Sequence, residues 1–280
     1  MRWRGAHRPE SLLYSIERLE GRLRAEPGQR PAAFIFHGGR CGSTLLARLF
    51  AAAGGARVFD EPGAFHDFRD ARWRQLASAD SRRALHALIA AHGLGPVPGE
   101  ARLVMKFDSR AVLAVPALRA CFPTVPFIYL LRSPREIVAS VGAAPPGFLA
   151  PDARAAMAAM FGGVEGALEN YSEEAWYAWY AERNLRAALD HARCFTEVID
   201  YGVFATRYLA TVNRLSGTAL RADDPRVEAV LSRHAKYPVR PFPAGSPPPD
   251  AATALQATKP LLAAEAAYAA WQAHMTSGSN

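Results

Sequence analysis

The chain has 280 residues, of which half are apolar and 21% are charged, and its 33 Lys and Arg exceed its 26 Asp and Glu. This composition excludes an intrinsically disordered chain, and the formal net charge of +7 favours anionic partners. No block of consecutive basic residues marks a nucleic-acid or membrane tract, so the charge favours a small anionic ligand and neither of those two partners.

The three cysteines, Cys41, Cys121 and Cys194, are widely spaced and offer neither metal-ligand spacing nor a disulfide framework. Such cysteine usage is typical of a reducing compartment. The N-terminal segment lacks the apolar run of a signal peptide, and no stretch of 18 apolar residues is free of charge. We therefore expect a cytoplasmic protein with no metal site.

Short apolar runs and longer helical patterns alternate along the chain. Helices are expected over 10–24, 44–53, 73–91, 111–121, 134–142, 152–168, 172–191 and 262–274. Strands are expected over 32–36, 56–59, 102–107, 126–131 and 195–199. Strands separated by helices predict an α/β fold, with a central parallel sheet covered by helices on both faces.

The chain is expected to form one domain over 1–280. Within it, residues 1–30 form an N-terminal helical extension and 260–275 a C-terminal helix, with a frayed tail from Thr276. Residues 238–250 form a proline-rich loop, since six prolines fall within twelve residues there. An aromatic set on or beside one expected helix is interpreted as core: Tyr171, Trp176, Tyr177, Trp179 and Tyr180.

The most informative segment is a glycine-rich turn between a strand and a helix, His37-Gly38-Gly39-Arg40-Cys41-Gly42-Ser43-Thr44. Such a turn presents consecutive backbone N–H groups at a positive helix terminus and so cradles an anion. Ser43 and Thr44 add hydroxyl donors. A tight turn that merely needs glycine is the alternative interpretation.

This loop departs from the nucleotide-kinase phosphate loop GxxxxGK[ST]. With Gly42 at the second glycine, His37 takes the place of the first glycine and Ser43 that of the lysine. The positive charge lies instead at Arg40, two residues ahead of Gly42. The loop therefore lacks the lysine with which a kinase neutralises the β and γ phosphates.

A second segment begins where the strand 126–131 ends. Ser133-Pro134-Arg135-Glu136 has the Ser, Pro and Glu of a helix start. Arg132 therefore lies at the strand end, and Ser140 lies two turns into the helix. An arginine and a serine so placed are unremarkable alone. Paired with the glycine loop at the end of another strand, they favour a second phosphate-binding position.

Both segments resemble motifs of sulfotransferases that use 3'-phosphoadenosine-5'-phosphosulfate (PAPS) as donor. Arg40-Cys41-Gly42-Ser43-Thr44-Leu45 resembles their 5'-phosphosulfate loop, [KR]-S-G-[ST]-T-[LW]. The resemblance implies that Arg40 binds the 5'-phosphate and its bridging oxygen and that the loop binds phosphate through Gly39, Cys41, Gly42, Ser43 and Thr44. Cys41 departs from the usual serine.

The resemblance extends to the second segment. Arg132 and Ser140, eight residues apart, match the arginine and serine of the 3'-phosphate motif. They would bind the phosphate that distinguishes PAPS from ATP. The family fold is a P-loop-type central parallel sheet flanked by helices. Its tyrosine beside the adenine is matched by Tyr201, although the acidic residues that usually follow are missing.

Two candidates for the catalytic base remain open. Glu61 follows Arg40 by 21 positions, as the base does in sulfotransferases of the tyrosylprotein type. Asp108 occupies the place of the basic histidine of cytosolic aryl and steroid sulfotransferases, and this departure favours Glu61. Lys106 could contact the sulfuryl group, or could direct its ammonium to solvent.

The resemblance implies transfer of a sulfuryl group from PAPS to a hydroxyl or amine of a small-molecule acceptor, without a metal, releasing 3',5'-ADP. A P-loop small-molecule kinase is the enzymatic alternative, and it suffers from the missing lysine. A nucleotide- or nucleic-acid-binding protein without catalysis is the alternative from another class. The sequence identifies neither the acceptor nor an oligomeric state.

Overall fold

A computed structural model describes residues 16–26, 28–95, 102–143, 147, 153–163, 168, 170–232 and 255–277. Its centre is a five-stranded sheet in the order β2-β3-β1-β4-β5, and every adjacent pair is parallel. The strands are β1 (Pro31–His37), β2 (Ala56–Asp60), β3 (Arg102–Lys106), β4 (Phe127–Leu131) and β5 (Glu197–Asp200). The α/β fold and the five expected strands are confirmed.

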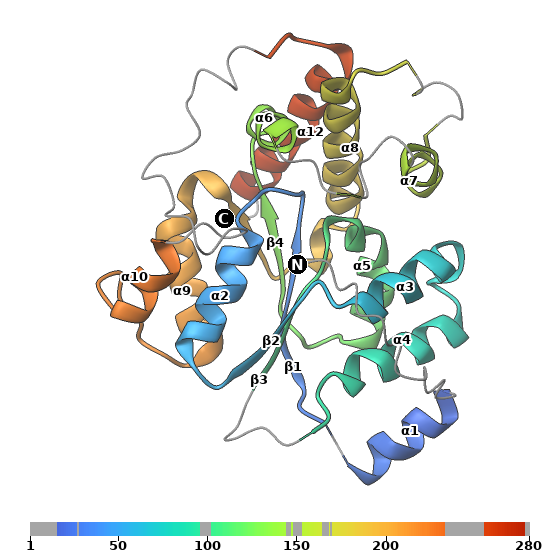
Figure 1. The fold of residues 1–280 in the computed structure, drawn as a ribbon, viewed down its shortest axis with the longest axis vertical. Coiled ribbons are helices and arrows are strands. Elements are labelled where there is room, and N and C mark those ends of the chain that lie inside the picture. Colours follow the sequence, from blue (N-terminus) through green and yellow to red (C-terminus); the bar gives the residue numbers. More distant parts are fainter. Residues whose placement is uncertain are drawn as a thin grey trace, which may run out of the picture.

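Helices cover this sheet from both sides. Helices α2, α9 and α10 gather on one side, and α3, α4 and α5 gather on the other (Figure 1). The helices are α1 (Ile16–Ala25), α2 (Ser43–Ala53), α3 (Gly63–Arg72), α4 (Ala79–Ala91), α5 (Val115–Cys121), α6 (Pro134–Ala143), α7 (Arg154–Met160), α8 (Glu173–Leu189), α9 (Phe204–Ser216), α10 (Pro225–Leu231) and α12 (Lys259–Ser277).

The strand order reverses direction at β1. The chain passes from β1 to β2 on one side of the sheet, whereas β4 and β5 lie on the other side. Connections that leave a parallel sheet in opposite directions open a crevice beyond the carboxyl ends of the strands. The glycine loop after β1 lies at this switch point, where such a sheet binds ligands.

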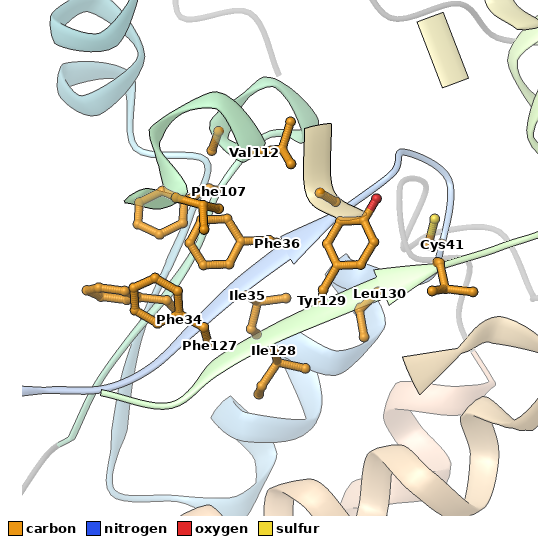
Figure 2. Packing of buried hydrophobic residues seen from close by; sticks show 14 of the residues in the cluster. Phe34, Ile35, Phe36, Cys41, Phe107, Val112, Phe127, Ile128, Tyr129 and Leu130 are labelled. Atoms are coloured by element: carbon orange, nitrogen blue, oxygen red, sulfur yellow. The ribbon is translucent and has the colours of Figure 1, made fainter. Parts of the chain in front are cut away.

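The core of the sheet is built from alternating side chains of β1 and β4. Phe34 and Phe36 lie on the same face as Phe127, with ring centroids 5.1–5.3 Å from it, and Ile35 lies on the opposite face (Figure 2). This is the two-residue period of a strand. Helices cover and bury both faces of the sheet, and the sequence of β1 is accordingly a continuous apolar run.

The aromatic set on α8 belongs to this core, as the sequence predicted. Trp176, Tyr177, Trp179 and Tyr180 are all buried, and Tyr171 packs against them as a half-buried residue. The indole rings of Trp176 and Trp179 are stacked, with centroids 4.9 Å apart. These rings pack the protein interior and form no aromatic cage.

The expected helix over 73–91 is wrong over residues 73–78 and confirmed over 79–91. The structure has α3, then a 3₁₀ turn at Trp73–Gln75, and only then α4. The hydroxyl of Ser78 accepts a hydrogen bond from the Ser81 N–H at 3.2 Å, which caps a new helix. Helix α3 itself was not expected, because Pro62 and Gly63 at its start look like a loop.

Other helix boundaries also differ from the prediction. Residues 109–114 form a 3₁₀ turn, and α5 starts only at Val115, where Pro116 fits the first turn. Helix α7 ends at Met160, before Gly162, whose φ of 71° is left-handed. Helices α9 and α10 were not expected at all.

The predicted frayed tail is wrong for its first two residues. Helix α12 runs to Ser277, and the side-chain hydroxyls of Thr276 and Ser277 bond to backbone carbonyls one turn earlier. The proline-rich loop 238–250 and the start of the helix expected at residue 10 lie outside the described residues. The single-domain interpretation stays a prediction.

Candidate active site

The glycine loop joins β1 to α2 through strained backbone. Gly39 and Gly42 have φ values of 91° and 75°, and Arg40, which has a side chain, has a φ of 55°. A non-glycine residue in this left-handed region is uncommon and costs free energy that the surrounding structure must offset.

Gly42 has a steric role as well. A Cβ atom at this position would lie 2.9 Å from the ring of Tyr201 and 3.2 Å from the hydroxyl of Tyr208. Gly42 is also the N-cap of α2, so the N–H groups of the first helical turn begin here. Because Gly42 has no side chain, the two tyrosines can pack against the loop. An alanine methyl group here would collide with them.

His37 holds the first half of the loop. One ring nitrogen, Nε2, lies 3.0 Å from the carbonyl oxygen of Phe107, and the other, Nδ1, accepts a hydrogen bond from the Gly39 N–H at 3.0 Å. Burial lowers the pKa of His37 to about 3. The ring is therefore neutral at pH 7, and the tautomer that satisfies both contacts carries its proton on Nε2.

Cys41 stabilises the second half of the glycine loop. Its thiol lies 2.8 Å from the Gly39 carbonyl oxygen, and its own carbonyl accepts a hydrogen bond from the Tyr208 hydroxyl at 2.7 Å. Burial raises the pKa of Cys41 to about 12, so the sulfur stays protonated. The residue that departs from the family's serine is thus used to fold the loop.

Arg132 follows β4 and reaches the loop from the side. Its Nη1 donates to the Arg40 carbonyl oxygen at 2.9 Å, and its Nε donates to the Glu136 carboxylate at 2.8 Å. The guanidinium also lies over the ring of Tyr201, 4.3 Å from the centroid. A cation–π contact of this kind adds to the two hydrogen bonds and fixes the planar head group.

One end of this fixed guanidinium has no protein partner. The Nη2 atom of Arg132 is buried and forms no hydrogen bond within the described residues. The side chain is only 6% exposed. A buried donor without a partner is costly, so such atoms occur where a ligand or an ion completes the bonding. Arg132 therefore keeps one donor available for a further hydrogen-bond acceptor.

The structure joins the two predicted phosphate sites directly. Arg40 Nε donates to the Ser140 hydroxyl at 2.8 Å, and Arg40 Nη2 donates to the Ser140 carbonyl at 2.9 Å. These residues are 100 positions apart in the sequence and were assigned to different phosphates. The Ser140 hydroxyl accepts from Arg40 and still has its own proton to donate.

Glu61 lies at the neighbouring strand ends. Its backbone has a φ of 54°, and its N–H donates to the Lys106 carbonyl at 2.7 Å. The Lys106 ammonium is buried and contacts both the Glu61 carboxylate and the Asp60 carboxylate, the latter at 2.8 Å. Lys106 therefore does not reach solvent. The Glu61 side chain is 43% exposed, so an acceptor has access to its carboxylate.

Asp108 is more deeply buried than Glu61, and its carboxylate is paired with two arginines. Its carboxylate contacts the Arg69 guanidinium, and Arg110 Nε donates to it at 2.8 Å. Burial alone would raise the pKa of Asp108, but the charges of Arg69 and Arg110 outweigh it and hold that pKa below its usual value. A 3% exposed carboxylate between two guanidiniums is poorly placed to take a proton from an acceptor.

The structure therefore gathers most of the predicted residues at one edge of the sheet. Tyr201 lies beside Gly42 and Arg132, while Ser43 and Thr44 occupy the first turn of α2. The sequence reasoning missed Arg69, which lies on the unexpected helix α3, and Tyr208, which lies on the unexpected helix α9. A prediction of those two helices would have identified Arg69 and Tyr208 as candidates.

Among the described residues, no group of His, Cys, Asp and Glu side chains is arranged to hold a metal ion. No helix in the described part of the chain has the length and apolarity needed to cross a membrane. No protein-family model matches the sequence, and no curated protein matches it.

Three solved structures similar to this chain carry the word sulfotransferase in their titles. The sulfotransferase domain of the Synechococcus PCC 7002 olefin synthase has a TM-score of 0.49 at 14% identity, over 88% of this chain and 95% of that chain. The sulfotransferase domain of the curacin biosynthetic pathway has a TM-score of 0.46 at 14% identity, over 74% and 80%.

A sulfotransferase from Mycobacterium tuberculosis H37Rv has a TM-score of 0.46 at 15% identity, over 75% of this chain and 72% of that chain. The three titles name the family whose motifs the sequence resembles. With identities of 14–15% and TM-scores below 0.5, nothing about the reaction follows from these likenesses.

Proposed function

We propose that the protein is a PAPS-dependent sulfotransferase acting on a small-molecule acceptor. The observation that carries this proposal is the Nη2 atom of Arg132, which lies beside the glycine loop, is buried and has no hydrogen bond to any described residue. One loop could serve any phosphate ligand. Arg132, at the end of the adjacent strand, pairs with Glu136 and keeps Nη2 for a further acceptor, which the 3'-phosphate of PAPS would supply.

On the donor side, the N–H groups of the loop after Gly39, whose own N–H bonds to His37, would bind the 5'-phosphosulfate together with Arg40, and Arg132 and Ser140 would bind the 3'-phosphate. Arg40 contacts Ser140, so it would lie between the two phosphate groups of the bound donor. Negative charge grows on the bridging oxygen as its bond to sulfur breaks. Arg40 would stabilise that charge, and such stabilisation, stronger in the transition state than in the ground state, accelerates the reaction.

On the acceptor side, Glu61 would take the proton from the attacking hydroxyl or amine. The acceptor atom forms a bond to sulfur, the bond between sulfur and the phosphate oxygen breaks, and 3',5'-ADP leaves. Lys106 is held beside Glu61 by buried contacts and would orient the carboxylate. Asp108, between Arg69 and Arg110, would be a structural anion.

Thermal-shift measurements with three ligands test this function against its rivals. We expect 3',5'-ADP to raise the melting temperature without a metal, and to do so more than ATP with Mg²⁺ or a single-stranded oligonucleotide. A larger shift with ATP and Mg²⁺ would favour a kinase. A shift with the oligonucleotide alone would favour a nucleic-acid-binding protein. Release of 3',5'-ADP from PAPS upon addition of a phenol would then demonstrate transfer.

A further inference from the structure

His66 lies on α3 at the same sheet edge as Glu61, and the mechanism so far does not use it. Its Nε2 atom is buried, lies 3.8 Å from the Asp108 carboxylate and forms no hydrogen bond within the described residues. The side chain is 19% exposed, so part of the ring remains accessible. The charges around it are otherwise paired, which makes this ring exceptional.

The surroundings keep the ring neutral. Burial lowers the pKa of His66, with the charges of Arg69 and Arg110 acting in the same direction, while those of Asp108 and Glu61 act in the opposite direction. The Asp108 carboxylate lies 3.8 Å from Nε2, beyond hydrogen-bond distance, and its negative charge favours the tautomer with the proton on that nitrogen. The remaining nitrogen, Nδ1, then carries a lone pair and no partner in the described part of the chain.

Glu61 and His66 both face the end of β3, since Glu61 pairs with Lys106 and His66 lies 3.8 Å from the carboxylate of Asp108, two residues further on. Five positions separate these residues, across the start of α3. An acceptor whose reacting group meets Glu61 therefore has its neighbouring atoms close to α3. A neutral imidazole with a lone pair recognises a hydrogen-bond donor there and rejects an anion or a pure acceptor group.

We propose that His66, beside Asp108, accepts a hydrogen bond from a second group of the sulfuryl acceptor, next to the group that reacts. The substrate class would then be molecules with two neighbouring hydrogen-bond donors, such as diols, catechols or amino alcohols. This inference rests on the proposed function. It concerns specificity, since the proton and the sulfuryl group still move at Glu61 and Arg40.

Catechol and phenol are the acceptor probes that test it, because they differ by one hydroxyl. The wild-type enzyme should have the higher kcat/KM with catechol, beyond the statistical advantage of two equivalent hydroxyls. His66→Phe keeps a ring of similar shape but removes both nitrogens. It should lower kcat/KM for catechol roughly two- to twelvefold more than for phenol, the range of one net hydrogen bond, chiefly through KM.

His66→Asn is the matched variant, because it retains a polar atom near the position of Nδ1. It should recover part of the catechol preference. Affinity for 3',5'-ADP, measured on both variants, reports whether the donor side is intact. An equal loss with both acceptors in His66→Phe, or an unchanged catechol preference, would overturn the proposal.

A binding measurement separates failure of this inference from failure of the proposed function. In protein labelled with ¹⁵N-histidine and saturated with 3',5'-ADP, catechol should shift one ring resonance that is absent in His66→Phe. If neither catechol nor phenol is sulfated but that resonance shifts in a saturable way, the His66 site stands and the proposed sulfuryl transfer to these acceptors fails. If transfer occurs and no such shift is seen, the His66 site is wrong.

Discussion

The donor side and the acceptor side of this sheet edge differ in how their charges are satisfied. On the donor side, Arg132 is fixed by Arg40, Glu136 and Tyr201, yet Nη2 has no hydrogen bond within the described residues. On the acceptor side, the buried ammonium of Lys106 already contacts two carboxylates.

This difference matches the kind of group that each side would receive under the proposed function. A buried cation with a spare donor binds an anion at little further cost, because desolvation has already occurred on folding. Paired charges attract no further ion, but they hold a base and a neutral ring in place for an uncharged group. A negatively charged donor and a neutral acceptor therefore fit the two sides.

The largest expected effect is on kcat, from replacing Glu61, the proposed base. Glu61→Gln keeps the shape of the side chain and removes its basicity, so kcat should fall about 10²–10⁴-fold. Affinity for 3',5'-ADP should remain close to wild type. Asp60→Asn is the matched control, because Asp60 contacts the same lysine. A Glu61→Gln enzyme that turns over at the wild-type rate with an alcohol acceptor would remove Glu61 from this role.

Breaking the buried ion pair of the acceptor side should affect stability. Arg69→Met leaves the Asp108 carboxylate buried with fewer cations, and losing one partner of a buried pair costs about 3–5 kcal/mol. Urea denaturation would measure the loss. The double variant Arg69→Met with Asp108→Asn should recover part of it. If the single variant were as stable as wild type, Asp108 would not depend on Arg69.

The loop itself should show a pH dependence through His37. The pKa of this residue falls from 6.5 in the unfolded chain to about 3 in the fold, so between these values the unfolded state binds the extra proton. Stability is therefore full above pH 6.5 and declines as the pH falls toward 3. At pH 5 the loss from this residue is about 2 kcal/mol.

Urea denaturation at pH 7 and pH 5 checks this expectation. His37→Gln cannot take up the proton and keeps a donor for the Phe107 carbonyl. The difference in unfolding free energy between the two pH values should therefore be smaller in this variant than in wild type. Equal differences in the two proteins would show that the His37 ring is not held neutral in the fold.

The sequence predicted the sheet well, because buried parallel strands are continuous apolar runs between turn signals. It failed at α3, because a proline and a glycine at a helix start look the same as a loop. Missing this helix also affected the prediction of the candidate site. Arg69 and His66 are carried by α3, so the surroundings of Asp108 could not be foreseen, and Asp108 remained an open candidate for the base.

The donor side was easier to predict because its residues follow strands whose ends meet at one edge. Arg40 and Ser140 were expected on different phosphates, and their direct contact is a finding of the structure. No local pattern reveals which atom of Arg132 lacks a partner, since that depends on Glu136, Tyr201 and the loop carbonyl together.

Calorimetry of 3',5'-ADP and 5'-AMP binding to Arg132→Ala, without metal, tests the central claim most directly. A charge-assisted hydrogen bond contributes about 1.5–3 kcal/mol, so affinity for 3',5'-ADP should fall more than tenfold while affinity for 5'-AMP hardly changes. Arg135→Ala, whose guanidinium pairs with Glu265, is the charge-matched control and should bind both ligands as wild type does. An equal loss of both ligands in Arg132→Ala would contradict a 3'-phosphate site at this arginine.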